Sequence, residues 1–222
     1  MNKKYIDIVT HYERCFAKHG DTHLGVDWPK KEHVDLRYRI MLEVIKGADA
    51  EKITLLDFGC GASHLYDYIK RKKLSNVNYS GLDLSAQFIK LCKQKYPNNI
   101  YYCTDILAND ADIPNFDYII LNGVFTEKQN LSYEDMFTYC KQMLTALFQK
   151  TNKGMAFNFM SKAVDWERDD LFHLSTDLLI DFLTKNLSRH FVIRNDYGLY
   201  EYTVYLYRKS EEKENSEQTC QK

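Results

Sequence analysis

The chain has 222 residues and nearly balanced charge, with 30 Lys and Arg residues against 31 Asp and Glu residues. This length suits one well-buried α/β domain with a short N-terminal addition. The balanced charge argues against a nucleic acid or an anionic membrane surface as partner, and it favours a small or neutral substrate. Because the six cysteines include no Cys-x-x-Cys pair and the sequence has neither a secretory h-region nor a long apolar span, we expect a cytoplasmic protein.

Two helices are predicted ahead of the first strand. Apolar residues recur at helical spacing within residues 1–23 and again within residues 31–45. Between these segments, Gly20 and Gly25 bracket a loop. We therefore expect residues 1–47 to form an N-terminal helical cover.

Residues 48–208 alternate between apolar runs and helical patterns, as a parallel sheet with crossover helices does. The predicted strands are 53–57, 77–83, 100–103, 116–121, 154–160, 191–194 and 202–207. The predicted crossover helices are 64–72, 86–95, 133–148 and 176–187. A short turn joins the last two strands, so they must run antiparallel. The tail 209–222 is charged and nearly free of apolar residues, and we expect it to be disordered.

The segment 55–63 carries the clearest motif. An apolar run ends in Asp57 and then turns through Gly59 and Gly61, which lets a nucleoside-bearing cofactor approach the backbone. A dinucleotide fold needs a third Gly, and His64 stands at that position, which argues against NAD. A carboxylate at Asp57 would repel a pyrophosphate but suits an ammonium group, directly or through water.

Two further acids follow predicted strands. Asp83 closes the second strand and is placed to bind ribose hydroxyls, while Asp105 follows the third. Ligands of open α/β sheets bind beyond the carboxyl ends of the strands, where the strand order reverses. We therefore expect Asp57, Asp83, Asp105 and Asn122 to lie at one edge of the sheet.

With these features the chain resembles the class I S-adenosylmethionine (SAM)-dependent methyltransferases, whose first motif is an acidic residue followed by x-Gly-x-Gly-x-Gly. Ser63 stands where the last Gly is usual. The resemblance implies a Rossmann-like fold, with a mostly parallel seven-stranded sheet, a C-terminal antiparallel hairpin strand and SAM as cofactor. The residues that it implies for cofactor binding are Asp57, Phe58, Gly59, Cys60, Gly61, Asp83, Leu84, Asp105, Ile106, Asn122, Gly123 and Val124.

The chain is also similar to a narrower group of small-molecule methyltransferases from bacterial glycan and secondary-metabolite genes. The segments that carry this similarity are 19–20, 25–28, 122–125 with Lys128, 156–159 and 196–201. The turn 121–125 contains no proline, unlike the Asp/Asn-Pro-Pro-Tyr/Phe turn of many enzymes that methylate base amines. This difference argues further against a nucleic-acid substrate.

Several of these segments supply substrate-site candidates. The candidates are Trp28, Arg37, Phe125, Asn158 and Tyr200. Trp28 either stacks on a ligand or packs against the core, and Arg37 either binds an acidic group or lies on a solvated helix face. Asn158 lies between two Phe residues on a predicted central strand, so its amide needs partners whether or not it contacts substrate.

An oxygen nucleophile usually needs a general base. His173, in the insertion after the fifth predicted strand, is the preferred catalytic residue. His64 is closer to the cofactor motif but opens a helix, while His11 and Tyr12 belong to a segment that could cover the cofactor. No His/Cys/Asp cluster with metal-ligand spacing is visible, so we expect no metal.

The sequence therefore favours a SAM-dependent methyltransferase that O-methylates a small molecule in a glycan or secondary-metabolite pathway. The alternative is a non-catalytic SAM-binding module or partner subunit, which would need no acceptor cavity. A nicotinamide-dependent oxidoreductase is disfavoured by the missing third Gly. The acceptor and the oligomeric state stay open at this stage.

Overall fold

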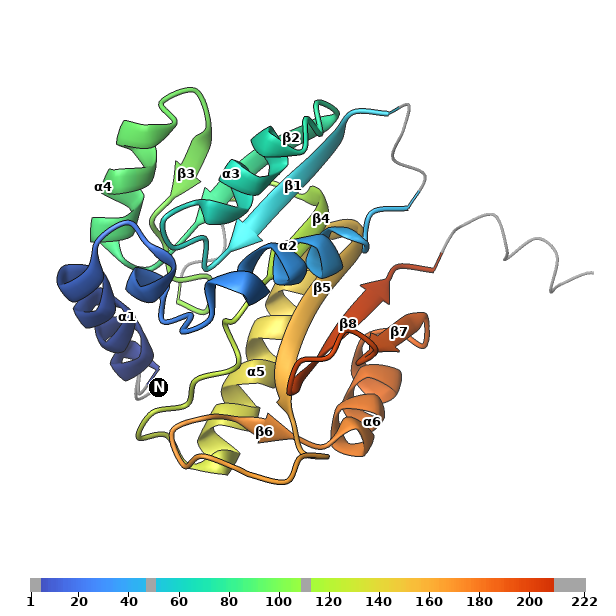
Figure 1. Cartoon of the computed structure of the whole chain (residues 1–222). Helices are drawn as coiled ribbons and strands as arrows, with labels where there is room; N and C mark the ends of the chain where they lie inside the picture. Colours follow the sequence, from blue (N-terminus) through green and yellow to red (C-terminus); the bar gives the residue numbers. More distant parts are fainter. Residues whose placement is uncertain (1–4, 47–50, 109–112, 210–222) are drawn as a thin grey trace, which may run out of the picture.

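A mixed sheet separates two helical layers in this computed structural model, which describes residues 5–46, 51–108 and 113–209 (Figure 1). The strand order is β3-β2-β1-β4-β5-β8-β7, with β6 paired to β5 outside that path. The strands are β1 (Ile53–Phe58), β2 (Val77–Leu82), β3 (Ile100–Tyr102), β4 (Phe116–Leu121), β5 (Thr151–Ser161), β6 (His173–Leu174), β7 (Phe191–Arg194) and β8 (Glu201–Tyr207).

β8 pairs antiparallel with both β5 and β7, whereas the other pairings are parallel. The predicted fold class is therefore confirmed: seven strands form the path, and an antiparallel strand lies near its end. The two-residue β6 is an addition that the sequence did not predict. It arises where the insertion after β5 returns to pair with Met160 and Ser161.

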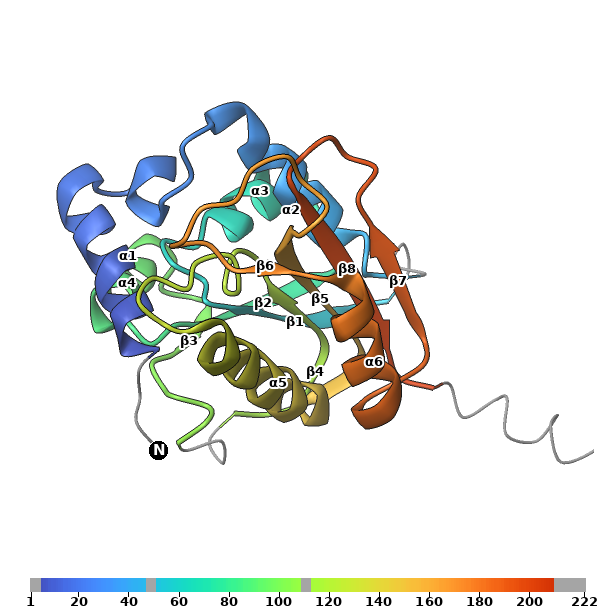
Figure 2. The same ribbon diagram turned by 90° about the horizontal axis from the view of Figure 1, so that it is seen from below.

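The helices occupy both faces of the sheet and its carboxyl edge. They are α1 (Ile6–His19), η1 (His23–Val26), η2 (Lys31–His33), α2 (Val34–Leu42), α3 (His64–Arg71), α4 (Ala86–Lys95), α5 (Tyr133–Gln149) and α6 (Thr176–Asn186). Side chains of α2, α3 and α4 pack on one face of the sheet and those of α5 and α6 on the other. α1 lies beside α4, beyond the carboxyl end of β1 (Figures 1 and 2).

The central strands are buried on both faces, as expected for strands covered by crossover helices. On β1, Leu56 and Phe58 join the core under α5 and α6, while Ile53 and Leu55 join the core under α2 and α3. Alternate residues of one strand thus supply both cores, which explains why the β1 sequence is a continuous apolar run rather than an alternating one.

The predicted helix over 31–45 forms η2 followed by α2, and α2 ends at Leu42, where the chain tightens. Val44 and Ile45 donate backbone hydrogen bonds to Met41 and Leu42, three residues earlier in each case. The predicted cover, 1–47, corresponds in the described residues to α1, η1, η2 and α2. Its boundary with 48–208 and nearly all of the tail 209–222 lie outside the described residues, so these domain limits stay predictions.

Within the described ranges, none of the helices has the length and apolar character needed to cross a membrane.

A buried ion pair connects α2 to the sheet. Arg37 donates from Nε to Glu201 Oε1 over 3.0 Å and from Nη2 to Oε2 over 3.0 Å. The Glu201 side chain is 3% exposed and that of Arg37 is 18% exposed. The guanidinium also lies 5.2 Å from the centre of the Trp28 ring. Arg37, which was predicted from the sequence to contact substrate, is therefore already paired with the carboxylate of Glu201 on β8.

We expect Arg37→Ala to destabilise the protein by about 3 to 5 kcal/mol, because it leaves the Glu201 carboxylate buried without its cation. Arg71→Ala is the matched control, since Arg71 and Asp35 form an exposed pair with side chains 56% and 51% exposed. Its cost should be below about 1 kcal/mol. Urea unfolding of both variants measures the difference, and equal costs would contradict a structural role for the Arg37 pair.

Candidate functional site

In the loop between β1 and α3, every second residue from 59 to 63 has a left-handed backbone conformation. Gly59, Gly61 and Ser63 have φ angles of 72°, 48° and 59°. Glycine adopts this conformation without steric cost, and a Cβ on Gly59 would lie 2.7 Å from Val124 Cγ2. Ser63 takes the same conformation in place of the usual Gly, and its buried hydroxyl lies 3.1 Å from Cys92 Sγ and 3.0 Å from the Tyr101 hydroxyl. These bonds help to hold a serine in a backbone conformation that it rarely adopts.

A pocket enclosing about 970 Å³, part of it open to solvent, lies beyond the carboxyl ends of β1, β2 and β4. The predicted site residues that line it are Trp28, Asp57, Phe58, Gly59, Cys60, Gly61, Asp83, Leu84, Asn122, Gly123 and Val124. The sequence thus identified three loops, far apart in the chain, that meet at one pocket.

Asp57, which is 4% exposed, and Asp83, which is half-buried, place two carboxyl groups in this pocket. Asp57 accepts a hydrogen bond of 2.8 Å from the Tyr79 hydroxyl. Its pKa is raised to about 7, chiefly by burial and less by the charge of Asp83, while the Tyr79 bond lowers it. Asp83 accepts from the backbone N–H groups of Gly61 and Ser85, each over 2.9 Å. Burial raises its pKa to about 6 despite these bonds. A positively charged ligand would favour the ionised form of both carboxyl groups.

Asn122 and Asn158 shape the turn after β4. Asn158 Oδ1 accepts a bond of 2.8 Å from the Gly123 N–H, so this buried side chain on β5 holds the turn in place without lining the pocket. The Asn122 side chain lines the pocket, and its Oδ1 and Nδ2 are both buried with no partner among the described residues. A buried amide without partners is a position where a ligand can supply the missing hydrogen bonds.

The cofactor candidates Asp105 and Ile106 do not line the pocket. Ile106 is 2% exposed and belongs to the core beneath α5. Asp105 contacts a lining residue instead: its carboxylate accepts a hydrogen bond of 2.6 Å from the hydroxyl of Tyr5, which lines the pocket.

The substrate candidates Arg37, Phe125 and Tyr200 also lie outside the pocket lining, for different reasons. Arg37 is paired with Glu201, and Phe125 is fully buried with its ring stacked on Phe159. Tyr200 is 53% exposed, and its ring contacts Trp166 rather than the pocket.

His173, the catalytic candidate, lies on β6 and is 4% exposed. Its Nδ1 donates to the Ser161 carbonyl over 2.7 Å, and its ring contacts Trp166. The structure therefore places this histidine away from the pocket lining, because the chain after β5 turns back to extend the sheet.

Other lining residues were missed by sequence reasoning. They are Tyr5, Ile8, Val9, Val26, Tyr38, Leu65, Leu82, Ser85, Phe88 and Tyr139; Tyr12 and His64 also line the pocket. The apolar residues whose helical spacing predicts α1 are Ile6, Val9, Tyr12 and Phe16; Val9 and Tyr12 line the pocket, whereas Ile6 is 42% exposed. The Tyr12 hydroxyl reaches the Gly123 carbonyl over 3.4 Å. Tyr139 comes from the middle of α5, where nothing local in the sequence separates it from an ordinary core residue.

The methyltransferase-domain family profile matches residues 56–147, which span the loop, β2 and the turn after β4. A protein of Mycobacterium tuberculosis that is named as a methyltransferase is 25% identical over 174 residues, which cover 76% of this chain and 99% of the relative. These matches support a SAM-dependent methyltransferase of the class I fold. The predicted family and cofactor are thereby confirmed.

Solved structures support the fold of this methyltransferase. The magnesium protoporphyrin IX methyltransferase of Synechocystis PCC 6803, with bound SAH, has a TM-score of 0.62 at 12% identity, over 93% of this chain and 97% of the other. A TehB-like SAM-dependent methyltransferase from Corynebacterium glutamicum has a TM-score of 0.52 at 15% identity, over 94% of this chain and 100% of the other.

The buried carboxyls make the stability of this methyltransferase depend on pH. Because the pKa of Asp57 is about 7 and that of Asp83 about 6, the folded state binds more protons than the unfolded state, whose carboxyls titrate near 4. The free energy of unfolding should therefore fall as pH rises from about 4 to 7. Asp57→Asn should remove much of this slope and be more stable than wild type at pH 8.

Denaturant unfolding across this pH range measures the effect. Asp181→Asn is the control, because Asp181 is 60% exposed on α6. A wild-type stability that is flat over the range would contradict the raised pKa values.

Proposed function

We propose that the methyltransferase binds SAM in the pocket at the carboxyl edge of the sheet and transfers its methyl group to an oxygen of a small molecule. The observation that carries the proposal is the meeting of Asp57 and Asp83, at adjacent strand ends, with the unpartnered Asn122 amide around one left-handed glycine loop. SAM has an ammonium group, a sulfonium and ribose hydroxyls, which match this set of carboxylates and amide in charge and hydrogen bonding.

Each group has a proposed part in holding the cofactor. Asp57 binds the ammonium group directly or through water, and the backbone from Gly59 to Gly61 approaches the methionine part. Asp83 binds the ribose hydroxyls with the lone pairs that its two backbone bonds leave over. Leu84 flanks the adenine, and Asp105 acts on that side through Tyr5, whose hydroxyl it holds. The turn of Asn122, Gly123 and Val124 lines the path to the methyl group.

When bound, SAM supplies a methyl group that its sulfonium already activates. The residues of the chain then have to hold the acceptor oxygen in line at about 3 Å and to exclude water. Tyr12 and Trp28 approach the turn after β4 from the N-terminal cover: the Tyr12 hydroxyl reaches Gly123 O, and a Cβ on Gly123 would lie 3.4 Å from Trp28 Nε1. We propose that these two rings close the methyl side of the pocket.

Several observations support a small acceptor and transfer to oxygen. The net charge is -1, the turn after β4 has no proline, and aromatic side chains of the cover narrow the pocket. The similarity to enzymes of glycan and secondary-metabolite genes favours such a pathway, and the cysteine pattern favours the cytoplasm. We assign no base role to His173, because its position on β6 and its bond to Ser161 keep it from the pocket lining.

Binding of SAM and of S-adenosylhomocysteine (SAH) should depend on Asp83. Asp83→Ala removes charge-assisted bonds to the ribose, worth about 1.5 to 3 kcal/mol, so both ligands should bind at least tenfold more weakly. Asp181→Ala, on the exposed side of α6, should bind them as wild type does. Calorimetric titration of the three proteins measures the affinities. Equal affinities for wild type and Asp83→Ala would remove Asp83 from the site.

The transfer itself is tested with SAM carrying a carbon-13 methyl group and mixtures of small hydroxylated acceptors, sugars and metabolites. We expect formation of SAH together with a new methyl resonance in the chemical-shift range of methoxyl groups, and loss of both with Asp83→Ala. A resonance typical of methyl on nitrogen or carbon would overturn transfer to oxygen. SAM binding without SAH formation for any acceptor would favour the non-catalytic module instead.

A further inference from the structure

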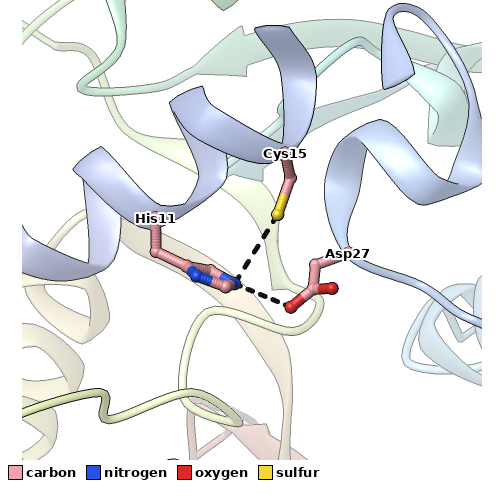
Figure 3. A group of neighbouring side chains, drawn as sticks. All are labelled: His11, Cys15 and Asp27. Carbon is pink, nitrogen blue, oxygen red and sulfur yellow. Dashed lines mark hydrogen bonds and ion pairs between the residues drawn. The ribbon is translucent and has the colours of Figure 1, made fainter. Parts of the chain in front are cut away.

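Three metal-ligating side chains meet between α1 and the end of η1 (Figure 3). His11 and Cys15 lie one turn apart on α1, and Asp27 follows η1. The His11 Nε2 atom is 2.7 Å from Asp27 Oδ2 and 3.7 Å from Cys15 Sγ. One ligand atom from each residue lies within 4.8 Å of the other two. From the sequence we expected no metal, because Asp27, the third member of this cluster, comes from a separate turn.

The local backbone fixes the third ligand. Asp27 has a left-handed conformation with φ of 56°, and its N–H donates to the Leu24 carbonyl over 3.1 Å. The next residue, Trp28, donates its N–H to the His23 carbonyl over 2.8 Å. These bonds close the turn and direct the Asp27 carboxylate toward the face of α1 that carries His11 and Cys15, as Figure 3 shows.

One of the ligand-atom distances matches that of a tetrahedral site. Zinc bonds of about 2.0 to 2.2 Å to nitrogen and oxygen and about 2.3 Å to sulfur place neighbouring ligand atoms roughly 3.3 to 3.7 Å apart. The distance from Cys15 Sγ to His11 Nε2 already has this value. The His11 to Asp27 pair is a hydrogen bond and has to open by roughly half an ångström as the proton is replaced by a metal.

The charge around the cluster also favours a cation. The carboxylates of Asp27 and Glu127 both act electrostatically on the Cys15 thiol, and Glu127 is 7% exposed. Lys18 acts on the thiol with the opposite sign, and Arg168 acts on Glu127 but is itself paired with Asp170. A divalent ion between His11, Cys15 and Asp27 would offset this accumulation of negative charge.

We propose that His11, Cys15 and Asp27 form a binding site for a divalent transition metal of the zinc type, which ties α1 to the turn after η1. Imidazole, thiolate and carboxylate together select borderline ions such as Zn²⁺ and Co²⁺ over Mg²⁺ and Ca²⁺, which prefer oxygen ligands alone. Three protein ligands leave the fourth position to water. The thiol proton is released to solvent as the metal binds.

This metal site adjoins the cofactor pocket without being part of it. Tyr12, Val26 and Trp28 are sequence neighbours of the ligands and line the pocket, whereas His11, Cys15 and Asp27 do not. The metal therefore fixes the N-terminal wall of the pocket and takes no part in methyl transfer. The inference does not rest on SAM binding, so its test is independent of the proposed function.

The test is a titration of the chelator-treated full chain with Co²⁺, followed by optical absorption. We expect saturation at one Co²⁺ per chain, with a thiolate-to-metal charge-transfer band in the near ultraviolet that Zn²⁺ abolishes by displacement. Cys15→Ser should lose the band, and Asp27→Asn should weaken binding at least tenfold. Zn²⁺ should raise the melting temperature of wild type but not of Cys15→Ser.

Cys103→Ser and His190→Gln are matched controls at exposed positions and should keep the band and the affinity. Far-ultraviolet circular dichroism verifies that each variant is folded. If Cys15→Ser fails to fold, the metal affinity of Asp27→Asn, whose altered side chain is half-exposed, tests the site. Absence of a saturable band in wild type would overturn the proposal. So would a band that survives Cys15→Ser, or wild-type affinity in Asp27→Asn.

Discussion

The parallel register of β1 with β2 and β4 is the constraint on which the site depends. Asp57 is opposite Gly81 on one side and Ile120 on the other, so the residues that follow these three strands leave the sheet at the same edge. The loop after β1 then needs left-handed residues to turn back into α3 over this edge. Everything proposed for the cofactor follows from these two facts, because they bring Asp57, Asp83 and Asn122 to one pocket.

This arrangement has an electrostatic cost in the protein alone. The buried Asp57 and the half-buried Asp83 share one pocket, and the loss of solvent raises the pKa of each toward neutrality. The backbone N–H groups of Gly61 and Ser85 offset part of the cost at Asp83, and the Tyr79 hydroxyl does so at Asp57. A cationic ligand recovers the remainder, so the same burial that weakens the free protein strengthens selection for a positively charged cofactor.

Local patterns in the sequence predicted most of the fold and about half of the pocket residues. The apolar runs and the glycine loop each depend on a few neighbouring residues, and these predictions match the described structure. The partners of Arg37 and Asp105 depend on contacts across more than ninety residues, with Glu201 and Tyr5 respectively. No periodicity or spacing reports such a contact.

His173 shows the same limit in another form. Its place after β5 suggested a position near the acceptor, but the insertion pairs back onto β5 as a short strand and turns the imidazole toward the Ser161 carbonyl. A residue that follows a strand is directed to the site only when the chain leaves the sheet there. After β1, β2 and β4 the chain does so, whereas after β5 the strand continues to Ser161.

The contacts of α1 couple its position to the cofactor pocket. The Tyr5 hydroxyl binds Asp105, Glu13 accepts a bond of 2.6 Å from the Ser85 hydroxyl, and the Tyr12 hydroxyl reaches the Gly123 carbonyl. Each of these partners is a proposed cofactor contact or lies within two residues of one. Since α1 contributes Tyr5, Ile8, Val9 and Tyr12 to the wall, a ligand that fills the pocket contacts both α1 and the loops to which α1 is bound. Ligand binding and the packing of α1 against these loops therefore stabilise each other by the same free energy.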